Sequence, residues 1–313
     1  MKKWKRILSD LEVLSALAVL CYMAAISLPS NNIWYMAAAS LAWQAHLVLL
    51  GFGLYLIVRQ RLSLATIHLF AACLVYTTVI PTYPASLGKE THAGTDLRIA
   101  HFNVLKSNRD YISTLKAAKE SCADFLSFQE VNEAWTRILV DGLKDEYPYR
   151  MVHSEEECCF GIAVFSKYPL DHEAVRYFGG VANLTGCVCK DGQEIAFITL
   201  HPQSPTSEAR LHTRNRHLLE AADYFSSIEG PKLAIGDFNT VPWDRNLEQF
   251  RDRLRLTDSR KNLAATYPSF APMLRIPIDH ILHSNQIRCT RFDTITSTSS
   301  DHLGVVGDYI INS

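Results

Sequence analysis

The chain has 313 residues, of which 48% are hydrophobic and 20% are charged, and its formal net charge is -1. A nearly neutral chain lacks the basic surplus expected of a protein that binds long stretches of nucleic-acid backbone. The average hides a division, because the first 80 residues are mostly apolar whereas the rest has the composition of an ordinary soluble domain.

Three apolar runs occupy the first part of the chain, at about 11–28, 33–58 and 62–80. Each is long enough to cross a hydrocarbon core of about 30 Å as a helix, which predicts a membrane anchor over residues 1–80. The polar residues inside the runs are interpreted as groups that find hydrogen-bond partners in the interior of a helix bundle; they are Gln44, His46 and His68. The alternative is a functional intramembrane site.

Basic residues decide the expected orientation. Four of them precede the first run, at Lys2, Lys3, Lys5 and Arg6, and Arg59 and Arg61 separate the second run from the third. This distribution predicts a cytoplasmic N-terminus and places the chain after the third run outside the cytoplasm. A cleaved signal peptide is the alternative for the N-terminus, but two further runs follow it, so we expect retained anchors in a bacterial inner membrane.

The eight cysteines show no paired C-x-x-C units, so we expect no thiolate zinc site. Two interpretations remain open for those of the soluble part. An exported domain permits a disulfide between Cys158 or Cys159 and Cys187 or Cys189, whereas the alternative is reduced, buried thiols.

Residues 81–96 carry Pro, Gly, Ser and Thr without apolar periodicity and are predicted to be a linker to a domain at 97–313. In chain order the domain is predicted to contain strands and helices that alternate at first, followed by strands at 159–165, 183–189 and 194–200 that pair antiparallel. The helix at 205–227 is expected to have Ser204 as its N-terminal cap and Pro205 in its first turn. Its inward stripe is predicted to be Leu211, Leu218, Leu219, Ala222 and Phe225, with Arg210, Arg214 and Arg216 pointing elsewhere.

The remaining predicted elements are strands at 97–103, 124–128, 232–236, 278–283 and 303–311 and helices at 108–121 and 132–144. This order favours mixed sheets flanked by helices over a doubly wound parallel sheet.

Polar residues cluster at the ends of these strands. Asn103, Glu130, His201, Asp237 and Asn239 follow strands, whereas Asp279 begins one and Asp301-His302 precedes one. Carboxylate and amide oxygens are the ligands that Mg²⁺ prefers, and imidazoles and carboxylates transfer protons. Together these groups predict a metal-assisted phosphoester hydrolase.

Seven short motifs occur in the order in which they stand in one known family. They are Phe102-Asn103-Val104, Phe128-Gln129-Glu130, Ser166-Lys167-Tyr168-Pro169, Thr199-Leu200-His201-Pro202, Gly236-Asp237-Phe238-Asn239, Ile278-Asp279-His280-Ile281 and Ser300-Asp301-His302-Leu303. Over about residues 97–311 the chain therefore resembles the endonuclease/exonuclease/phosphatase superfamily. The resemblance implies an α/β (α+β) fold, a four-layer sandwich of two mixed β-sheets flanked by helices.

The resemblance also implies roles for the site residues and Mg²⁺, or Mn²⁺, as the cofactor. Glu130 would be the principal metal ligand, with Asn103 and Asp301 close to the ion. Asp237 and Asn239 would orient or activate the attacking water and hold the phosphate. His302, positioned by Asp279, would act on the nucleophilic water or the phosphoryl oxygens, and His201 would donate to the phosphate or the leaving group. Which histidine is the acid and which the base stays open.

Two arginines are weaker candidates for contact with substrate phosphate. Arg275 could reach it from the loop before Asp279 or could instead bond backbone carbonyls, and Arg214 could do so or belong to a solvated helix face. The chain departs from the family at Lys167, where arginine is commoner, and in lacking an assignable acidic partner for His201.

A narrower resemblance comes from Thr266-Tyr267-Pro268-Ser269-Phe270 and from 274–280, combined with the three apolar runs. They resemble the bacterial membrane-anchored branch of the superfamily. We therefore expect a hydrolase held in the bilayer by three transmembrane helices and acting outside the cytoplasm on a phosphoester, with lipid-linked phosphate as the favoured class. The alternatives are an extracytoplasmic nuclease, for which nucleic acid is a substrate only, and a non-catalytic binding module. The sequence gives no oligomeric state.

Overall fold

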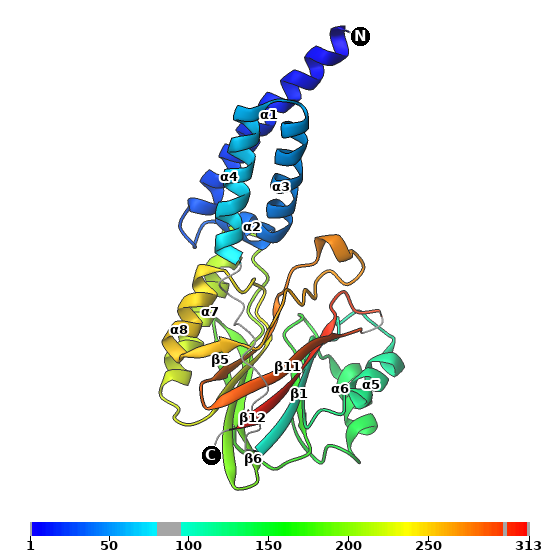
Figure 1. The fold of residues 1–313 in the computed structure, drawn as a ribbon. Helices are drawn as coiled ribbons and strands as arrows, with labels where there is room; N and C mark the ends of the chain where they lie inside the picture. The colour runs from blue at the N-terminus through cyan, green and yellow to red at the C-terminus, as the bar shows by residue number, and fades with distance from the viewer. Residues whose placement is uncertain (1, 80–94, 297–298, 312–313) are drawn as a thin grey trace. The chain divides into compact units, whose positions relative to one another are not determined.

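The computed structural model describes residues 2–79, 95–296 and 299–311. It divides into an N-terminal helical unit and a C-terminal α/β unit (Figure 1). The predicted linker at 81–96 lies almost entirely outside the described residues. The α/β unit begins with β1 (Thr95–Asn103), two residues before the predicted start of the domain.

The helical unit contains α1 (Lys2–Ser27), α2 (Ile33–Ser40), α3 (Ala42–Val58) and α4 (Leu62–Val79). The second apolar run was expected to be one helix, but it breaks at Leu41, and the axes of α2 and α3 differ by 66°. The Ser40 hydroxyl donates to the Met36 carbonyl at 2.9 Å, a bond that favours bending at the end of a helix. Two helices are therefore long and apolar enough to cross a membrane, or three if the bent pair forms one span.

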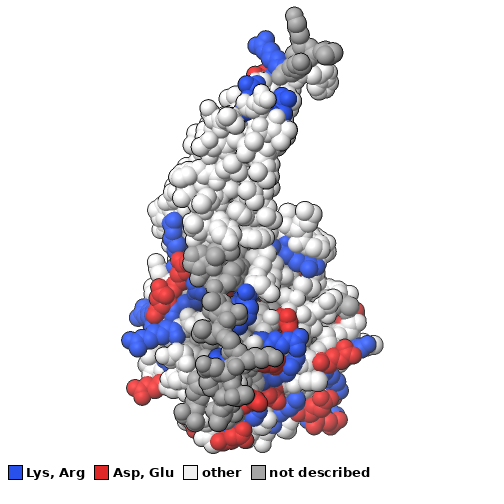
Figure 2. Space-filling model, in the orientation of Figure 1, with Lys and Arg blue, Asp and Glu red and all other residues white. Residues whose placement is uncertain are grey.

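Charged groups are few along the helical unit (Figure 2). Glu12 is only 1% exposed and pairs with Arg59 and Arg61 at 3.0 Å each. His46 Nδ1 lies 2.9 Å from the Ala72 carbonyl and His68 Nδ1 2.8 Å from the Leu64 carbonyl. These contacts agree with the interpretation of both histidines as satisfied interior groups.

Two six-stranded sheets form the α/β unit. The first has the order β11-β12-β1-β2-β4-β3 and the second the order β5-β6-β7-β8-β10-β9. The strands after β1 are β2 (Phe125–Gln129), β3 (Tyr149–His153), β4 (Ile162–Ser166), β5 (Leu170–Phe178), β6 (Val181–Lys190), β7 (Gln193–Thr199), β8 (Lys232–Asp237), β9 (Leu256–Asp258), β10 (Asp279–Ser284), β11 (Ile287–Ile295) and β12 (Gly304–Ile311). The β1–β2 and β7–β8 pairs are parallel and the other pairs antiparallel, so both sheets are mixed, as predicted.

Three apolar cores hold the layers together. The inner faces of the sheets meet in a core that includes Ile99, Phe125, Ile235 and Ile281. The outer face of the first sheet is covered by α5 (Tyr111–Glu120) and α6 (Glu133–Leu143), and that of the second by α7 (Glu208–Ser226) and α8 (Arg245–Leu254). The predicted four-layer sandwich is confirmed.

The strands that the sequence did not predict are all edge strands: β3, β5, β9 and β11. Of these, β5 is mostly exposed, so it lacks the apolar alternation that marks a strand. The helix α8 was also missed. The predicted antiparallel set at 159–200 is wrong in part. Its first strand, β4, pairs with β2 and β3 in the other sheet, and only β6 and β7 pair with each other.

Details of α7 also differ from the prediction. Its cap is Ser207, whose side chain accepts from the Arg210 amide, and not Ser204. Leu219 is 56% exposed, although it was assigned to the inward stripe, whereas Arg214 is fully buried. All eight cysteines are free, so no disulfide joins Cys158 or Cys159 to Cys187 or Cys189.

Candidate active site

Strand direction brings the polar groups together. The carboxyl ends of β1 and β2, which are parallel, carry Asn103 and Glu130, and the parallel pair β7 and β8 ends near His201 and at Asp237. Side chains alternate along a strand, so Asp237 points to the same face as Ile235 of the inner core. The candidate site is therefore the polar end of the core between the two sheets.

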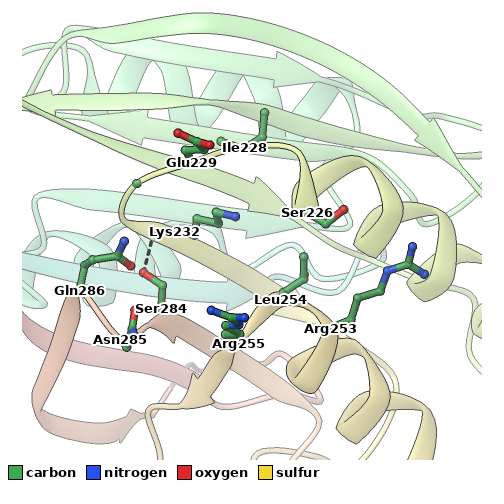
Figure 3. A pocket seen from close by; sticks show the side chains of 11 residues that line it. Ser226, Ile228, Glu229, Lys232, Arg253, Leu254, Arg255, Ser284, Asn285 and Gln286 are labelled. Atoms are coloured by element: carbon green, nitrogen blue, oxygen red, sulfur yellow. Dashed lines mark hydrogen bonds between the residues drawn. The ribbon is translucent and has the colours of Figure 1, made fainter.

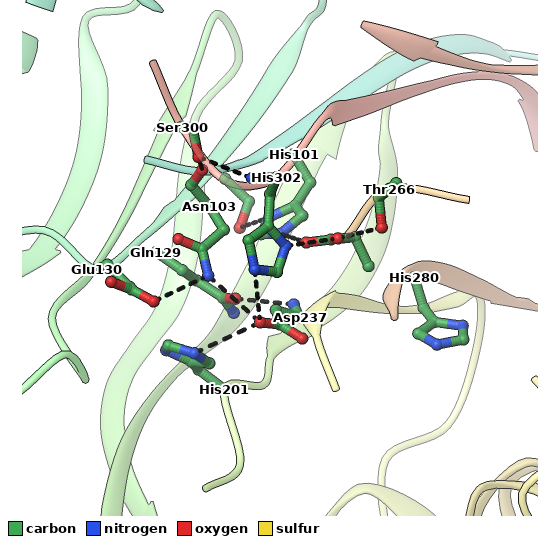
Figure 4. A network of polar contacts seen from close by, with 12 residues as sticks. His101, Asn103, Gln129, Glu130, His201, Asp237, Thr266, His280, Ser300 and His302 are labelled. Atoms are coloured by element: carbon green, nitrogen blue, oxygen red, sulfur yellow. Dashed lines mark hydrogen bonds and ion pairs between the residues drawn. The ribbon is translucent and has the colours of Figure 1, made fainter. Parts of the chain in front are cut away.

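Asn103 links two carboxylates at this end (Figure 4). Its Nδ2 lies 3.2 Å from Glu130 Oε1 and 3.3 Å from Asp237 Oδ2. The second oxygen of Glu130 accepts from the Lys106 amide at 3.0 Å, and Glu130 itself has a left-handed backbone with φ of 65°. Positive φ is uncommon for a residue other than glycine and occurs often at functional sites.

A buried network surrounds Asp279. Its Oδ2 lies 2.9 Å from His302 Nδ1 and accepts from the Thr266 hydroxyl, and its Oδ1 lies 3.4 Å from His101 Nε2. Ser300 completes the frame, because its hydroxyl donates to the Asn103 carbonyl at 2.7 Å and lies 3.1 Å from the His302 amide. Ser300 thus holds the backbone of His302, and Asp279 holds its ring.

Asp237 stands between the two histidines predicted to act on protons. Its Oδ2 lies 3.7 Å from His302 Nε2 and 3.8 Å from His201 Nε2, while its Oδ1 accepts from the Asn239 amide at 2.8 Å. Asn239 also has a left-handed backbone, with φ of 50°, and donates from its side chain to the Pro202 carbonyl. Oδ2 is the oxygen of Asp237 that faces the site.

Gln129 joins the two sheets directly beneath these residues. Its Nε2 donates to the Leu200 carbonyl at 2.7 Å and its Oε1 accepts from the Asp237 amide at 2.8 Å. Gly236 makes this approach possible, since its φ is +147° and a Cβ there would lie 2.1 Å from the Leu200 oxygen. The Gln129 side chain, from β2, therefore fixes the backbone of Asp237 on β8.

Burial and charge separate the protonation states of these groups. Burial lowers the pKa of His201 to about 3, and nearby His302 adds to the effect, so His201 is neutral. Burial alone would raise the pKa of Asp279, but the charge of His302 and hydrogen bonds from His101 and His302 lower it well below the usual range. Burial would lower the pKa of His302, yet the charges of Asp279 and Asp237 raise it. Asp279 and His302 are therefore an ion pair.

The remaining carboxylates favour a cation. Burial raises the pKa of Asp237, and the negative charges of Asp279 and Glu130 raise it further. Burial also raises the pKa of Asp301, and the charge of Glu130 adds to that rise. One oxygen of Asp301, Oδ1, is buried without a hydrogen-bond donor among the described residues. A divalent cation is the species that such a set of oxygens fits.

Two groups in the described part of the chain have three potential ligand atoms within 4.8 Å of one another, Asp237 with Asp279 and His302, and an exposed Asp171, His172 and Glu194. Asp279 and His302 already form an ion pair with each other, so we assign them to proton transfer and charge stabilisation and not to the cation. The carboxylate oxygens of Glu130 and Asp301 are the better donors for a hard cation.

The two predicted phosphate-binding arginines do not join the network drawn in Figure 4. Arg275 donates from Nε to the Ser269 carbonyl at 3.1 Å, the backbone alternative considered above. Arg214 is fully buried in α7 and donates to Asn215 Oδ1 at 2.9 Å. A basic pocket of about 510 Å³ lined by Lys232, Arg253 and Arg255 lies at the opposite end of β8 from Asp237 (Figure 3).

Sequence reasoning missed His101, Gln129 and Thr266. The first two carried a signal. His101 lies two residues before Asn103 on β1, and alternation places both on one face. Gln129 directly precedes Glu130 in the chain. Thr266 comes from a loop, and only the tertiary structure places its hydroxyl on Asp279.

Solved structures share this fold. The chain has 19% identity and a TM-score of 0.54 to an endonuclease/exonuclease/phosphatase from Beutenbergia cavernae, over 70% of this chain and 72% of that one. For D. rerio TDP2 complexed with single-strand DNA product the identity is 14% and the TM-score is 0.58, and the match covers 69% of this chain and 99% of that one. For the human Nocturnin catalytic domain with bound sulfate the identity is 16% and the TM-score is 0.56, and the match covers 69% of this chain and 95% of that one.

No curated protein matches the chain. A family model does, over residues 100–302, which is more than half of the chain and includes each residue of the network described above. The chain therefore belongs to the endonuclease/exonuclease/phosphatase family.

Proposed function

We propose that the chain is a membrane-anchored phosphoester hydrolase that depends on Mg²⁺ or Mn²⁺ and acts outside the cytoplasm. The observation that carries the hydrolase proposal is the convergence of Glu130, Asn103 and Asp237 with the Asp279–His302 ion pair at one edge of the inner core. Glu130 and Asp301 supply carboxylate oxygens for the cation, with Asn103 beside them, and the cation would neutralise charge on the phosphoryl group.

The other residues act on protons and on the phosphate. Asp237 Oδ2 accepts the proton of the attacking water, since its Oδ1 is held by the Asn239 amide. His302, kept cationic by Asp279, stabilises negative charge on a phosphoryl oxygen. His201 is neutral before substrate binds and contributes a hydrogen bond to the phosphate or the leaving group.

The membrane anchor is supported by the surface of the helical unit. Large apolar side chains are exposed along it, including Leu14 at 57%, Leu17 at 57%, Val48 at 68% and Phe70 at 64%. A continuous apolar surface of this kind is unfavourable in water and suits a hydrocarbon environment. Anchoring raises the local concentration of lipid head groups, so phosphoesters of the bilayer are the favoured substrate class.

The test uses the purified full chain in detergent, with Mg²⁺ or with chelator, on a bis-aryl phosphate, plasmid DNA, lysophospholipid and sphingomyelin. We expect metal-dependent turnover that falls by about 10²-fold or more in Asp237→Asn and His302→Gln. His172→Ala is the matched control, because His172 is exposed on β5 and belongs to the other cluster. Turnover on DNA alone would favour the nuclease alternative, and no turnover on any substrate would favour a binding module.

Orientation has a separate test. A reporter fused after Ser313 should be active only outside the cytoplasm, because the basic residues of the N-terminus and of the turn at Arg59 and Arg61 favour the cytoplasmic side. Cytoplasmic reporter activity would contradict the proposed orientation and leave the hydrolase proposal intact.

A further inference from the structure

The loop between Thr266 and Ile276 carries an apolar tip. Phe270 is 79% exposed, Met273 90% and Leu274 59%, and the residues between them are Ala271 and Pro272. None of these five side chains carries a charge or a hydrogen-bonding group. A single exposed apolar residue is ordinary, but a group of large ones on a short segment marks an interaction surface.

The fold presents this tip outward and braces its base. Residues Pro272–Leu274 form a 3₁₀ turn, and the Leu274 amide donates to the Ala271 carbonyl at 2.9 Å. Arg275 closes the loop by donating from Nε to the carbonyls of Pro268 and Ser269. The apolar side chains are therefore not folded back onto the domain, although the backbone that carries them is well bonded. This loop is drawn in orange in Figure 1.

The base of the same loop forms one wall of the candidate active site. The Tyr267 ring lies 4.8 Å from the His302 ring, and the Ser269 amide donates to the Asp301 carbonyl at 2.7 Å. The neighbouring Thr266 hydroxyl donates to Asp279. Whatever the tip contacts is thereby held close to the catalytic groups.

We propose that Phe270, Met273 and Leu274 enter the boundary between head groups and acyl chains of a phospholipid bilayer, so that the active site works at the membrane surface. The proposal rests on the membrane attachment proposed above. The chain between Val79, the end of α4, and Thr95, the start of β1, reaches at most about 55 Å, so an anchored domain stays near the bilayer. A tip without polar side chains suits a lipid surface better than a protein partner, whose interface would pair polar groups around it.

Photocrosslinking in a reconstituted bilayer tests the tip without requiring turnover. The full chain is placed in nanodiscs of phosphatidylethanolamine and phosphatidylglycerol with p-benzoylphenylalanine replacing Phe270, and in a matched variant replacing Ile112. Ile112 is 81% exposed on α5 and has no comparable apolar tip around it, which makes it the control. We expect lipid adducts by mass spectrometry at position 270 and none at position 112, with unchanged unfolding temperatures.

The outcomes separate the proposals. Equal lipid labelling at both positions, or none at 270 in a chain that has inserted, overturns the bilayer contact. Adducts to a second copy of the chain at 270 also overturn it and identify a protein interface. Failure of the chain to enter nanodiscs contradicts the anchor itself, and Asp237→Asn should leave the adduct at 270 unchanged because labelling does not depend on catalysis.

Discussion

Replacement of Gln129 tests how the two sheets hold the candidate site. The side chain is fully buried and bonds the Leu200 carbonyl on one side and the Asp237 amide on the other. Gln129→Leu keeps the approximate volume but leaves both backbone groups buried without a partner. At about 1–3 kcal/mol for each unsatisfied group, we expect a loss of roughly 2–6 kcal/mol. That is a large part of the about 5–15 kcal/mol typical of a domain.

The measurement is thermal unfolding of the full chain in detergent, together with turnover on the bis-aryl phosphate. For a domain of this size about 1 kcal/mol corresponds to 2–4 °C, so the unfolding temperature should fall by roughly 5–20 °C. Turnover of the remaining folded protein should also fall, because the backbone of Asp237 loses its anchor.

Asn183→Leu is the matched control for Gln129→Leu. Asn183 is fully buried on β6, where it donates to the Val181 carbonyl at 2.7 Å and lies 2.9 Å from His217 Nε2. Its loss should lower the unfolding temperature by a similar amount and leave turnover of the folded protein unchanged. A shift of less than about 2 °C for Gln129→Leu would refute the reasoning, because the bonds would then contribute little to joining the sheets.

Three further changes test other parts of the domain. His101→Asn removes the group that faces Asp279 Oδ1, and the loss of one charge-assisted contact, about 1.5–3 kcal/mol, should lower kcat roughly 10- to 100-fold with little change in KM and an altered pH profile; an unchanged kcat would show that His101 only fills space. Burial lowers the pKa of His217 to about 3 from its ordinary 6.5, so the unfolded chain binds that proton first and the stability from neutral His217 is complete above about pH 6.5 and lost as the pH falls toward 3. The slope of the unfolding free energy against pH gives the number of protons taken up on unfolding, and between about pH 3 and 6.5 this number should fall by about one in His217→Gln. An unchanged slope would contradict the burial assigned to His217. Arg260→Met leaves the carboxylate of Asp258 buried without its cation and should cost about 3–5 kcal/mol in denaturant unfolding, whereas adding Asp258→Asn should recover part of that loss; no recovery would place the cost in packing and not in charge.

The sequence predicted the central strands and the fold class because these elements carry strong local patterns. Interior strands such as β2 and β8 are apolar on buried faces and end in polar motifs, so both their existence and their ends could be read from the chain. The edge strand β5 and the break at Leu41 could not, because β5 buries little surface and the break falls inside an apolar run.

The sequence by itself determined which residue types stand at the ends of which strands, since alternation and strand-end motifs are local properties. Those local properties were enough to indicate Asn103, Glu130 and Asp237 as candidate site residues. Only the tertiary structure decided that His101 and Thr266 share Asp279 with His302 and that Gln129 reaches across to the Asp237 amide. Those contacts join residues from separate strands and loops, and their geometry depends on how two sheets pack face to face, which no local pattern encodes.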